Sequence, residues 1–172
     1  MIVRREAPPD HQAVRTVVAA AFAETASTEL VEVRLLDALR ACDSWLPKLS
    51  LVAEDNAGTL LGHVVCSRAC VADAEVVALG PLAVRPDHQR AGVGSALMHA
   101  VLAAADALDE PLVALLGHTD YYPRFGFRPG DELGVRPPVP QWGAHFQVRP
   151  LTGYRPSLRG EFRYAKPFRD LG

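Results

Sequence analysis

A loop that joins an apolar segment to a helical segment carries residues suited to binding phosphate. It holds two glycines one residue apart with a cation nearby, in the order Gln89, Arg90, Ala91, Gly92, Val93, Gly94 and Ser95. A helix begins with backbone N–H groups that have no helical acceptor, and glycine lets another molecule approach them closely. Successive amides in such a turn bind phosphate, and Arg90 adds a positive charge at the rim. The pattern predicts a phosphate or pyrophosphate site; an ordinary helix start with two convenient glycines is the alternative.

Two common nucleotide-binding motifs fit this loop poorly. A Walker loop ends in Gly-Lys-Ser/Thr, which this stretch lacks. The dinucleotide fingerprint requires a third glycine where this chain has Leu97, and an acidic residue about 20 positions further on, whereas Asp109 and Glu110 come earlier. A nucleotide-dependent protein of another fold therefore remains only as a minor alternative.

The strand expected before the loop contains a break. Residues 76–84 are apolar enough for a central strand, yet they include Gly80-Pro81, and proline marks strand edges or bulges because it cannot donate to the ladder. A bulge here would separate this strand from a parallel neighbour expected at residues 112–116, leaving the amides of Leu82 and Val84 to face the gap. An extended ligand with amides of its own could lie there as an added strand. A pantetheine arm attached to a pyrophosphate has this shape.

The remaining patterns supply the elements that hold this junction. Helical periodicity predicts helices at residues 10–23, capped by Asp10, at residues 28–41, capped by Ser27 or Thr28, and at residues 92–108. Strands are expected at residues 1–6, 49–54, 60–72, 74–84, 112–116, 146–151 and 161–168, with a hairpin turn at 55–58, a helical turn at 120–125 and a loop at 126–141. The helix at 92–108 followed by a buried strand indicates a parallel crossover. We therefore expect one α+β domain over residues 1–172, with flanking helices and a mixed, mostly antiparallel sheet that contains one splayed parallel strand pair.

Composition narrows the function classes. With 172 residues and 49% hydrophobic content the chain can bury one sound core, and a formal net charge of −2 argues against nucleic acid or an anionic membrane as the main partner. Apolar runs stop well short of the ~20 residues of a membrane span, and the start of the chain lacks a signal-peptide core. An odd number of cysteines (Cys42, Cys66, Cys70), with no metal-ligand spacing, predicts free thiols, a cytoplasmic protein and no bound metal.

Three segments together resemble one known family. Residues 89–94, QRAGVG, are similar to the Q/R-x-x-G-x-G/A motif of the GNAT superfamily, the acetyl-CoA-dependent N-acetyltransferases. Residues 82–86, LAVRP, resemble the L-x-V-x-P strand end of that family, and residues 121–127, YYPRFGF, resemble its Y-x-R/K-x-G-F segment. The order of the expected elements resembles this fold along nearly the whole chain. The GPLAV and YYPRFGF segments look most like the bacterial YhbS-like branch.

The resemblance implies an enzyme that moves an acetyl group directly from the thioester of acetyl-CoA to a primary amine. It implies that the backbone of residues 89–95 binds the CoA pyrophosphate, and that the strand end at Leu82, Ala83 and Val84 binds pantetheine and polarises the thioester. It also implies that Tyr122 protonates the departing thiolate, while Tyr121 is expected to pack. Acetyl-CoA and an amine are the expected partners, and a homodimer is left open.

The general base and the acceptor stay open. Many family members carry a glutamate on the strand before the motif, and residues 76–84 here contain no acid, which leaves Glu75, His118, Asp120 or water. The acceptor site is expected to be formed by the helix at 28–41 and the loop at 126–145, with Trp142 and His145 as candidate walls. The amine and the range of acyl-CoAs are not identified. Because of the missing acid, an acyl-CoA-binding sensor or docking domain without turnover is the alternative.

Overall fold

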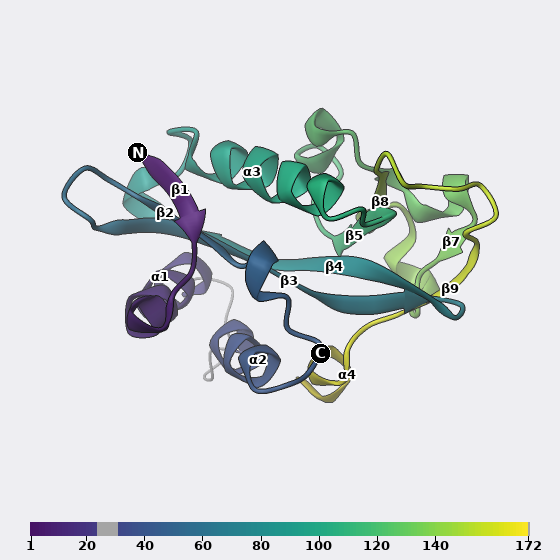
Figure 1. The fold of residues 1–172 in the computed structure, drawn as a ribbon, viewed down its shortest axis with the longest axis horizontal. Helices are drawn as coiled ribbons and strands as arrows, with labels where there is room; N and C mark the ends of the chain where they lie inside the picture. The colour runs from purple at the N-terminus through teal and green to yellow at the C-terminus, as the bar shows by residue number, and fades with distance from the viewer. Residues whose placement is uncertain (24–30, 172) are drawn as a thin grey trace.

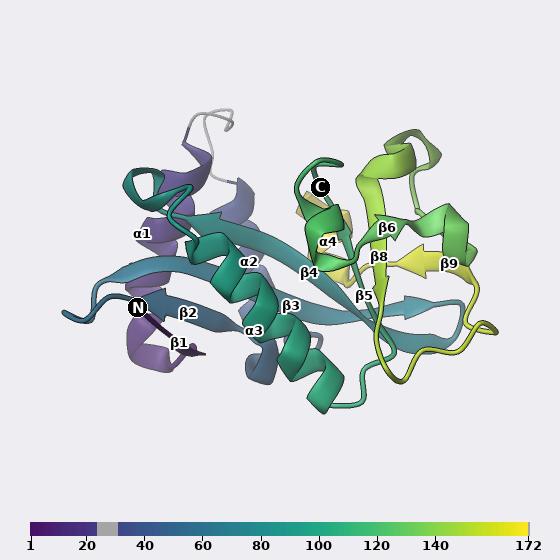
Figure 2. The ribbon, with the colours of Figure 1, turned by 90° about the horizontal axis from the view of Figure 1, so that it is seen from above.

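The computed structural model describes residues 1–23 and 31–171, and its centre is a twisted sheet with helices on both faces (Figure 1). Helix α3 crosses one face, and α1, α2 and α4 lie against the other, as Figures 1 and 2 together show. The helices are α1 (His11–Phe22), α2 (Val31–Arg40), α3 (Val93–Ala107) and α4 (Lys166–Leu171). The strands are β1 (Ile2–Arg5), β2 (Leu51–Glu54), β3 (Leu60–Val71), β4 (Ala74–Val84), β5 (Leu112–Leu116), β6 (Arg128–Pro129), β7 (Val135–Arg136), β8 (Phe146–Pro150) and β9 (Gly160–Arg163).

The strands pair in the order β1-β2-β3-β4-β5-β8-β6, with β9 paired to β3 and β7 to β9. Neighbours from β1 to β4 are antiparallel, β4 and β5 are parallel, and β5 is antiparallel to β8. This is the predicted mixed sheet: an antiparallel meander followed by one crossover through α3. The strands predicted at residues 1–6, 60–72, 74–84 and 112–116 agree with β1, β3, β4 and β5.

The alternation of side chains along the central strands divides the core between the two faces. In β3, Val64 and Cys66 pack under α3, whereas Val65 between them packs with α1 and α2. In β2, Leu51 and Ala53 likewise face α3. Because successive strand residues point to opposite faces, each apolar strand contributes to both cores, which explains why these strands are continuously hydrophobic.

Three local predictions need correction. Asp10 precedes α1, but its carboxylate accepts hydrogen bonds from Arg4 and from the Ala7 amide, and it makes no cap bond to the helix. The loop expected at 126–141 contains the short strands β6 and β7, which proline and glycine keep to two residues each. The strand expected at 161–168 ends at Arg163, and α4 begins at Lys166, because Pro167 occupies the first helical turn, where a missing N–H costs nothing. The start predicted for the second helix, including its cap at Ser27 or Thr28, lies outside the described residues.

A buried polar cluster joins the first strand to α2. The Glu6 carboxylate, whose side chain is 0% exposed, contacts Arg40 of α2 and accepts hydrogen bonds from Ser50 Oγ at 2.5 Å and from His63 Nε2 at 2.7 Å. The His63 Nδ1 atom is buried and has no partner in the described part of the chain, which fits a neutral ring protonated on Nε2. Arg40 also lies 3.7 Å from Asp37. This cluster fixes the position of α2 relative to the sheet.

Candidate functional site

The parallel strands β4 and β5 separate toward their carboxyl ends. They pair only at Val77↔Val113 and Ala78↔Ala114, although β4 continues to Val84. The cause is the predicted bulge: Val64 of β3 faces Leu82, and Cys66 faces Leu79, so that Gly80 and Pro81 together oppose one residue. An extra residue in one strand bends it away from its neighbour. On its other edge β5 pairs with β8 along its whole length, from Leu112↔Pro150 to Leu116↔Phe146.

The backbone at the end of β4 points its free groups into this gap. The Arg85 amide donates to the Leu61 carbonyl of β3 at 2.9 Å, and amides alternate in direction along a strand. The amides of Leu82 and Val84 therefore point away from β3, toward β5. The Gln89 side chain lies on the same side, since its Nε2 donates to the Val84 carbonyl at 3.4 Å.

The start of α3 lies at the end of this gap. Gly92, with φ of 86°, is the N-cap residue in the left-handed region, which glycine adopts without strain. Ala96 makes the first bond into the helix, donating to the Gly92 carbonyl at 3.0 Å. The amides of Val93, Gly94 and Ser95 therefore precede the first helical acceptor, and they carry the partial positive charge of the helix start.

One cavity, of about 680 Å³, runs from the start of α3 into the gap; we call it the helix-start cavity. Its lining residues are Ala21, Phe22, Leu82, Val84, Gln89, Arg90, Gly92, Gly94, Ser95, His118, Tyr121, Tyr122 and Arg124. Most residues predicted to bind the coenzyme thus surround one space. Ala83 and Val93 have buried side chains in the two cores, and the exposed Ala91 does not line it.

A second cavity, of about 740 Å³, adjoins the first and is lined mainly by apolar side chains; we call it the apolar cavity. Its lining residues are Phe22, Glu32, Leu35, Leu79, Gly80, Pro81, Leu82, Leu116, Gly117, His118, Tyr122, Pro138, Val139, Trp142, Tyr164, Phe168 and Arg169. Trp142, one of the two residues predicted to wall the acceptor site, lines this cavity. His145, the other, does not line it and places Nδ1 3.1 Å from the Gly117 carbonyl. The sequence contained no signal for the contributions of α1 and α4.

Four residues line both cavities: Phe22, Leu82, His118 and Tyr122. Tyr122 begins a helical turn, and its ring contacts Tyr121 and Phe127 with centroids 5.0 Å and 5.9 Å apart. Burial of the Tyr122 hydroxyl, aided by the neighbouring Tyr121, raises its pKa to about 12. Tyr122 is therefore a neutral hydrogen-bond donor at physiological pH, positioned where the two cavities meet.

Of the three residues predicted as candidate general bases, only His118 lies where the two cavities meet, since it lines both of them. Glu75 is seven residues before Leu82 along β4, about 23 Å away at the rise of a strand, and its side chain is 73% exposed beside Arg68. Asp120 is exposed and lines neither cavity.

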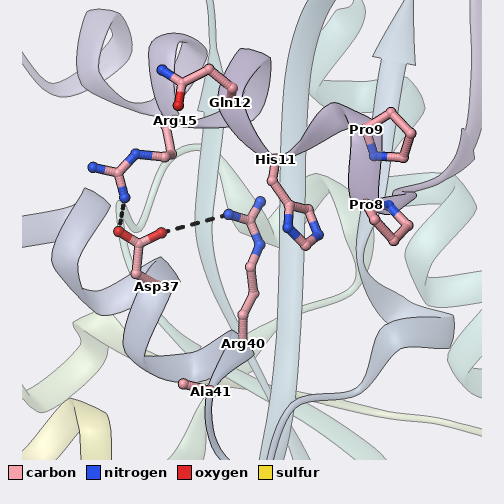
Figure 3. A pocket seen from close by; sticks show the side chains of 8 residues that line it. All are labelled: Pro8, Pro9, His11, Gln12, Arg15, Asp37, Arg40 and Ala41. Carbon is pink, nitrogen blue, oxygen red and sulfur yellow. Dashed lines mark ion pairs between the residues drawn. The ribbon is translucent and has the colours of Figure 1, made fainter.

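A third hollow, of about 510 Å³, is a polar feature of the surface (Figure 3). It lies between the start of α1 and the end of α2, and Asp37 pairs with both Arg15 and Arg40 across it. These ion pairs link α1 to α2 and neutralise the Asp37 carboxylate within the hollow.

The described residues contain neither a metal-binding cluster nor a membrane-spanning helix. No group of three or more His, Cys, Asp or Glu side chains in residues 1–23 and 31–171 is placed to hold a metal ion. Within the same residues, every helix is too short or too polar to cross a membrane.

Comparisons with known proteins agree with this geometry. The family model for the acetyltransferase (GNAT) domain matches residues 47–129. Two Escherichia coli K12 proteins are similar: the uncharacterized N-acetyltransferase YjhQ is 34% identical over 92% of this chain and 88% of its own length, and the uncharacterized N-acetyltransferase YhbS is 30% identical over 88% of each.

Solved structures match nearly the full length. A GNAT family acetyltransferase from Brucella melitensis, in complex with acetyl-CoA, has a TM-score of 0.79 and 32% identity, covering 97% of both chains. Escherichia coli YhbS in complex with CoA has a TM-score of 0.88 and 26% identity, covering 99% of this chain and 93% of its own.

Proposed function

The chain belongs to the GNAT family of acetyltransferases and is an acyltransferase; we propose that it transfers an acetyl group directly from acetyl-CoA to a primary amine. One observation carries this proposal: two cavities meet at the parted ends of β4 and β5, where Leu82, His118 and Tyr122 line both of them. One cavity has the polar helix start that a pyrophosphate requires, and the other has room for an acceptor. The ligands of the similar Brucella melitensis and YhbS structures, acetyl-CoA and CoA, support this assignment.

In this proposal the helix-start cavity holds the coenzyme. The amides of Val93, Gly94 and Ser95 bind the pyrophosphate, and Arg90 adds a positive charge at the cavity wall. The outward amides of Leu82 and Val84 pair with the pantetheine arm as an additional strand would. The thioester then lies at the inner end of this cavity, beside the residues that both cavities share.

The proposed transfer needs a donor for the oxyanion, a donor for the departing thiolate and an acceptor for the proton of the amine. The amine nitrogen attacks the thioester carbon, and a β4 amide stabilises the oxyanion that forms. The C–S bond then breaks, and the Tyr122 hydroxyl, whose pKa burial raises to about 12, donates its proton or a hydrogen bond to the departing thiolate. The excess proton of the amine passes to His118 or to water.

The cysteines support direct transfer without a covalent enzyme intermediate. Cys42, Cys66 and Cys70 line neither cavity in the described part of the chain. Cys66 is buried in the core under α3, and this burial raises the pKa of its thiol far above its ordinary value, so it is not a nucleophile at neutral pH.

The test is a panel of primary amines incubated with acetyl-CoA, with free CoA thiol and N-acetylated product both measured. We expect thiol release that depends on the amine, with one product formed per thiol. Tight CoA binding with no amine-dependent release from any member of a broad panel would contradict the proposal. Isolation of an acetylated cysteine as an intermediate would contradict the direct route alone.

A further inference from the structure

The described walls of the apolar cavity are mostly apolar and carry a single carboxylate. Most of its described lining side chains are aliphatic or aromatic, and among them Glu32, in the first turn of α2, is the only carboxylate. Arg169 also lines the space, but its side chain belongs to an exposed residue of α4. Apolar walls select an apolar ligand body, and a single polar group fixes its orientation.

Three aromatic rings form a continuous wall on one side of this cavity. Trp142 and Tyr164 lie edge to face with centroids 6.0 Å apart, and Tyr164 and Phe168 lie 4.7 Å apart with an angle of 39° between their planes. Burial raises the pKa of Tyr164 above its ordinary value, so this ring is uncharged. Aromatic rings of a ligand pack favourably against such a wall, in offset or edge-to-face contact.

One oxygen of the Glu32 carboxylate, Oε2, is buried and lacks a hydrogen-bond donor among the described residues. A buried carboxylate oxygen without a donor is unfavourable, and native structures usually satisfy such atoms. A ligand that brings an ammonium group into the cavity supplies both the donor and the opposite charge. The cluster of Glu6 and Arg40 holds α2, and hence Glu32, in place before any ligand arrives.

We infer that the apolar cavity selects primary amines carried on an aromatic body, with Trp142, Tyr164 and Phe168 packing against that body and Glu32 binding the ammonium group. This inference rests on the proposed function. The role assigned to Glu32 is recognition of the charged amine, which is the dominant form at neutral pH because aliphatic amines have pKa values of about 10. Removal of the proton stays with His118 or water.

The first experiment compares three acceptors with the same reacting group: 2-phenylethylamine, ethylamine and spermidine. We expect kcat/KM for 2-phenylethylamine to exceed that for ethylamine by about tenfold or more, since one buried ring is worth at least that factor. Spermidine, a polycation without an apolar body, should be the poorer substrate as well.

The second experiment removes the carboxylate. Glu32→Gln should raise KM for 2-phenylethylamine about tenfold, the usual cost of losing a charge-assisted hydrogen bond, and should leave KM for acetyl-CoA unchanged. Glu132→Gln is the matched control, because Glu132 is exposed in the turn Gly130–Leu133 and lines neither cavity. Trp142→Ala should lower kcat/KM for 2-phenylethylamine by a larger factor than it lowers kcat/KM for ethylamine, because only the aromatic amine packs against this ring.

Calorimetry separates recognition from turnover. Protein saturated with CoA, which carries no acetyl group, is titrated with 2-phenylethylamine, and we expect binding that Glu32→Gln weakens about tenfold. Faster acetylation of ethylamine or spermidine than of 2-phenylethylamine would overturn this inference and leave the proposed function standing. Absence of transfer to every amine would overturn the proposed function. In that case the titration decides the inference, which fails if the aromatic amine does not bind or binds Glu32→Gln equally well.

Discussion

The ring of Tyr122 packs directly against the backbone of Gly117, so closely that a Cβ atom on Gly117 would overlap Cε2 of the ring and lie 2.8 Å from Cδ2. Gly117 follows β5, and its carbonyl accepts hydrogen bonds from the Gln147 side chain and from His145. The glycine therefore cannot retreat from the ring, and its lack of a side chain sets where the Tyr122 hydroxyl lies.

The first prediction tests this contact. Gly117→Ala should displace the Tyr122 ring and lower kcat by about tenfold to a hundredfold, because a shift of ~1 Å in a catalytic group costs up to that much. The control is Gly153→Ala, since a Cβ at Gly153 would meet no atom closer than 3.4 Å. Equal kcat in both variants and the wild type would show that the glycine does not position the ring.

The second prediction concerns the hydroxyl itself. Tyr122→Phe keeps the ring and removes the proton donor, so kcat should fall by about tenfold to a hundredfold with little change in KM for acetyl-CoA. Tyr154→Phe, a change outside both cavities, should have no effect. An unchanged kcat in Tyr122→Phe would remove this residue from the mechanism.

The third prediction is the pH dependence that follows from the same residue. The pKa of Tyr122 is raised to about 12, so the folded enzyme keeps the phenol proton above pH ~10, where an ordinary tyrosine would lose it. With a slow acceptor, kcat should therefore show no loss assignable to this proton until the pH approaches 12. A decline centred near pH 10 that is absent in Tyr122→Phe would contradict this environment for the hydroxyl.

The fourth prediction couples Gly94, at the start of α3, to Tyr121, which precedes the helical turn at Tyr122–Phe125. A Cβ on Gly94 would lie 2.8 Å from the hydroxyl oxygen of Tyr121, and the next Tyr121 atom is 4.0 Å away. Gly94→Ala should weaken CoA binding about tenfold through this clash, and adding Tyr121→Phe should restore most of the affinity, because the clashing atom is gone. Calorimetry with CoA measures both. If the double variant binds as weakly as Gly94→Ala, the methyl group blocks the ligand itself.

The fifth prediction concerns stability in acid. Burial opposes ionisation of Glu6, but hydrogen bonds from His63 and Ser50 and the charge of Arg40 outweigh it and lower the Glu6 pKa to about 2 from an ordinary 4.5. Its stabilising contribution is present above pH 4.5 and is lost as the pH falls toward 2. Burial also lowers the pKa of His63 below its ordinary 6.5, so protonation of the unfolded chain reduces stability as the pH falls below 6.5.

Glu6→Gln therefore should have two effects on the free energy of unfolding. At neutral pH the free energy of unfolding should fall by about 3 kcal/mol, because the buried Arg40 loses its close ion pair with Glu6 and keeps only the longer contact with the half-exposed Asp37. Its decrease between pH 4.5 and 2 should become shallower, because the titrating carboxylate is gone. Denaturant unfolding at several pH values measures both, with Glu132→Gln as the exposed control. A pH profile with the wild-type slope would show that Glu6 is not the group responsible.

The sequence predicted the backbone geometry around the helix-start cavity well because its physics is local. A bulge at Gly80-Pro81, free amides at Leu82 and Val84, and a glycine-rich helix start follow one another within a short stretch, and each follows from residue type alone. The sequence-based prediction of a parted parallel pair is confirmed by the two-residue register of β4 and β5. The roles given to Tyr122 and to the amides remain predictions.

The apolar cavity could not be predicted in the same way. Phe22 is far from Tyr164 and Phe168 in the chain, and the three line one cavity only because α1 and α4 pack on the same face of the sheet (Figure 1). The apolar alternation of residues 161–168 favoured a strand, and only the position of Pro167 indicated a helix start. Glu32 carried no motif at all; its importance arises from a buried oxygen that only the folded structure reveals.

The separation of the two cavities along the chain has an evolutionary consequence. Apart from Ala21 and Phe22, the helix-start cavity is built within residues 82–124, whereas the apolar cavity draws on segments near both termini. Mutations near either end of the polypeptide can therefore change the lining of the apolar cavity in descendants of this gene, while residues 82–124, which form most of the helix-start cavity, need not change.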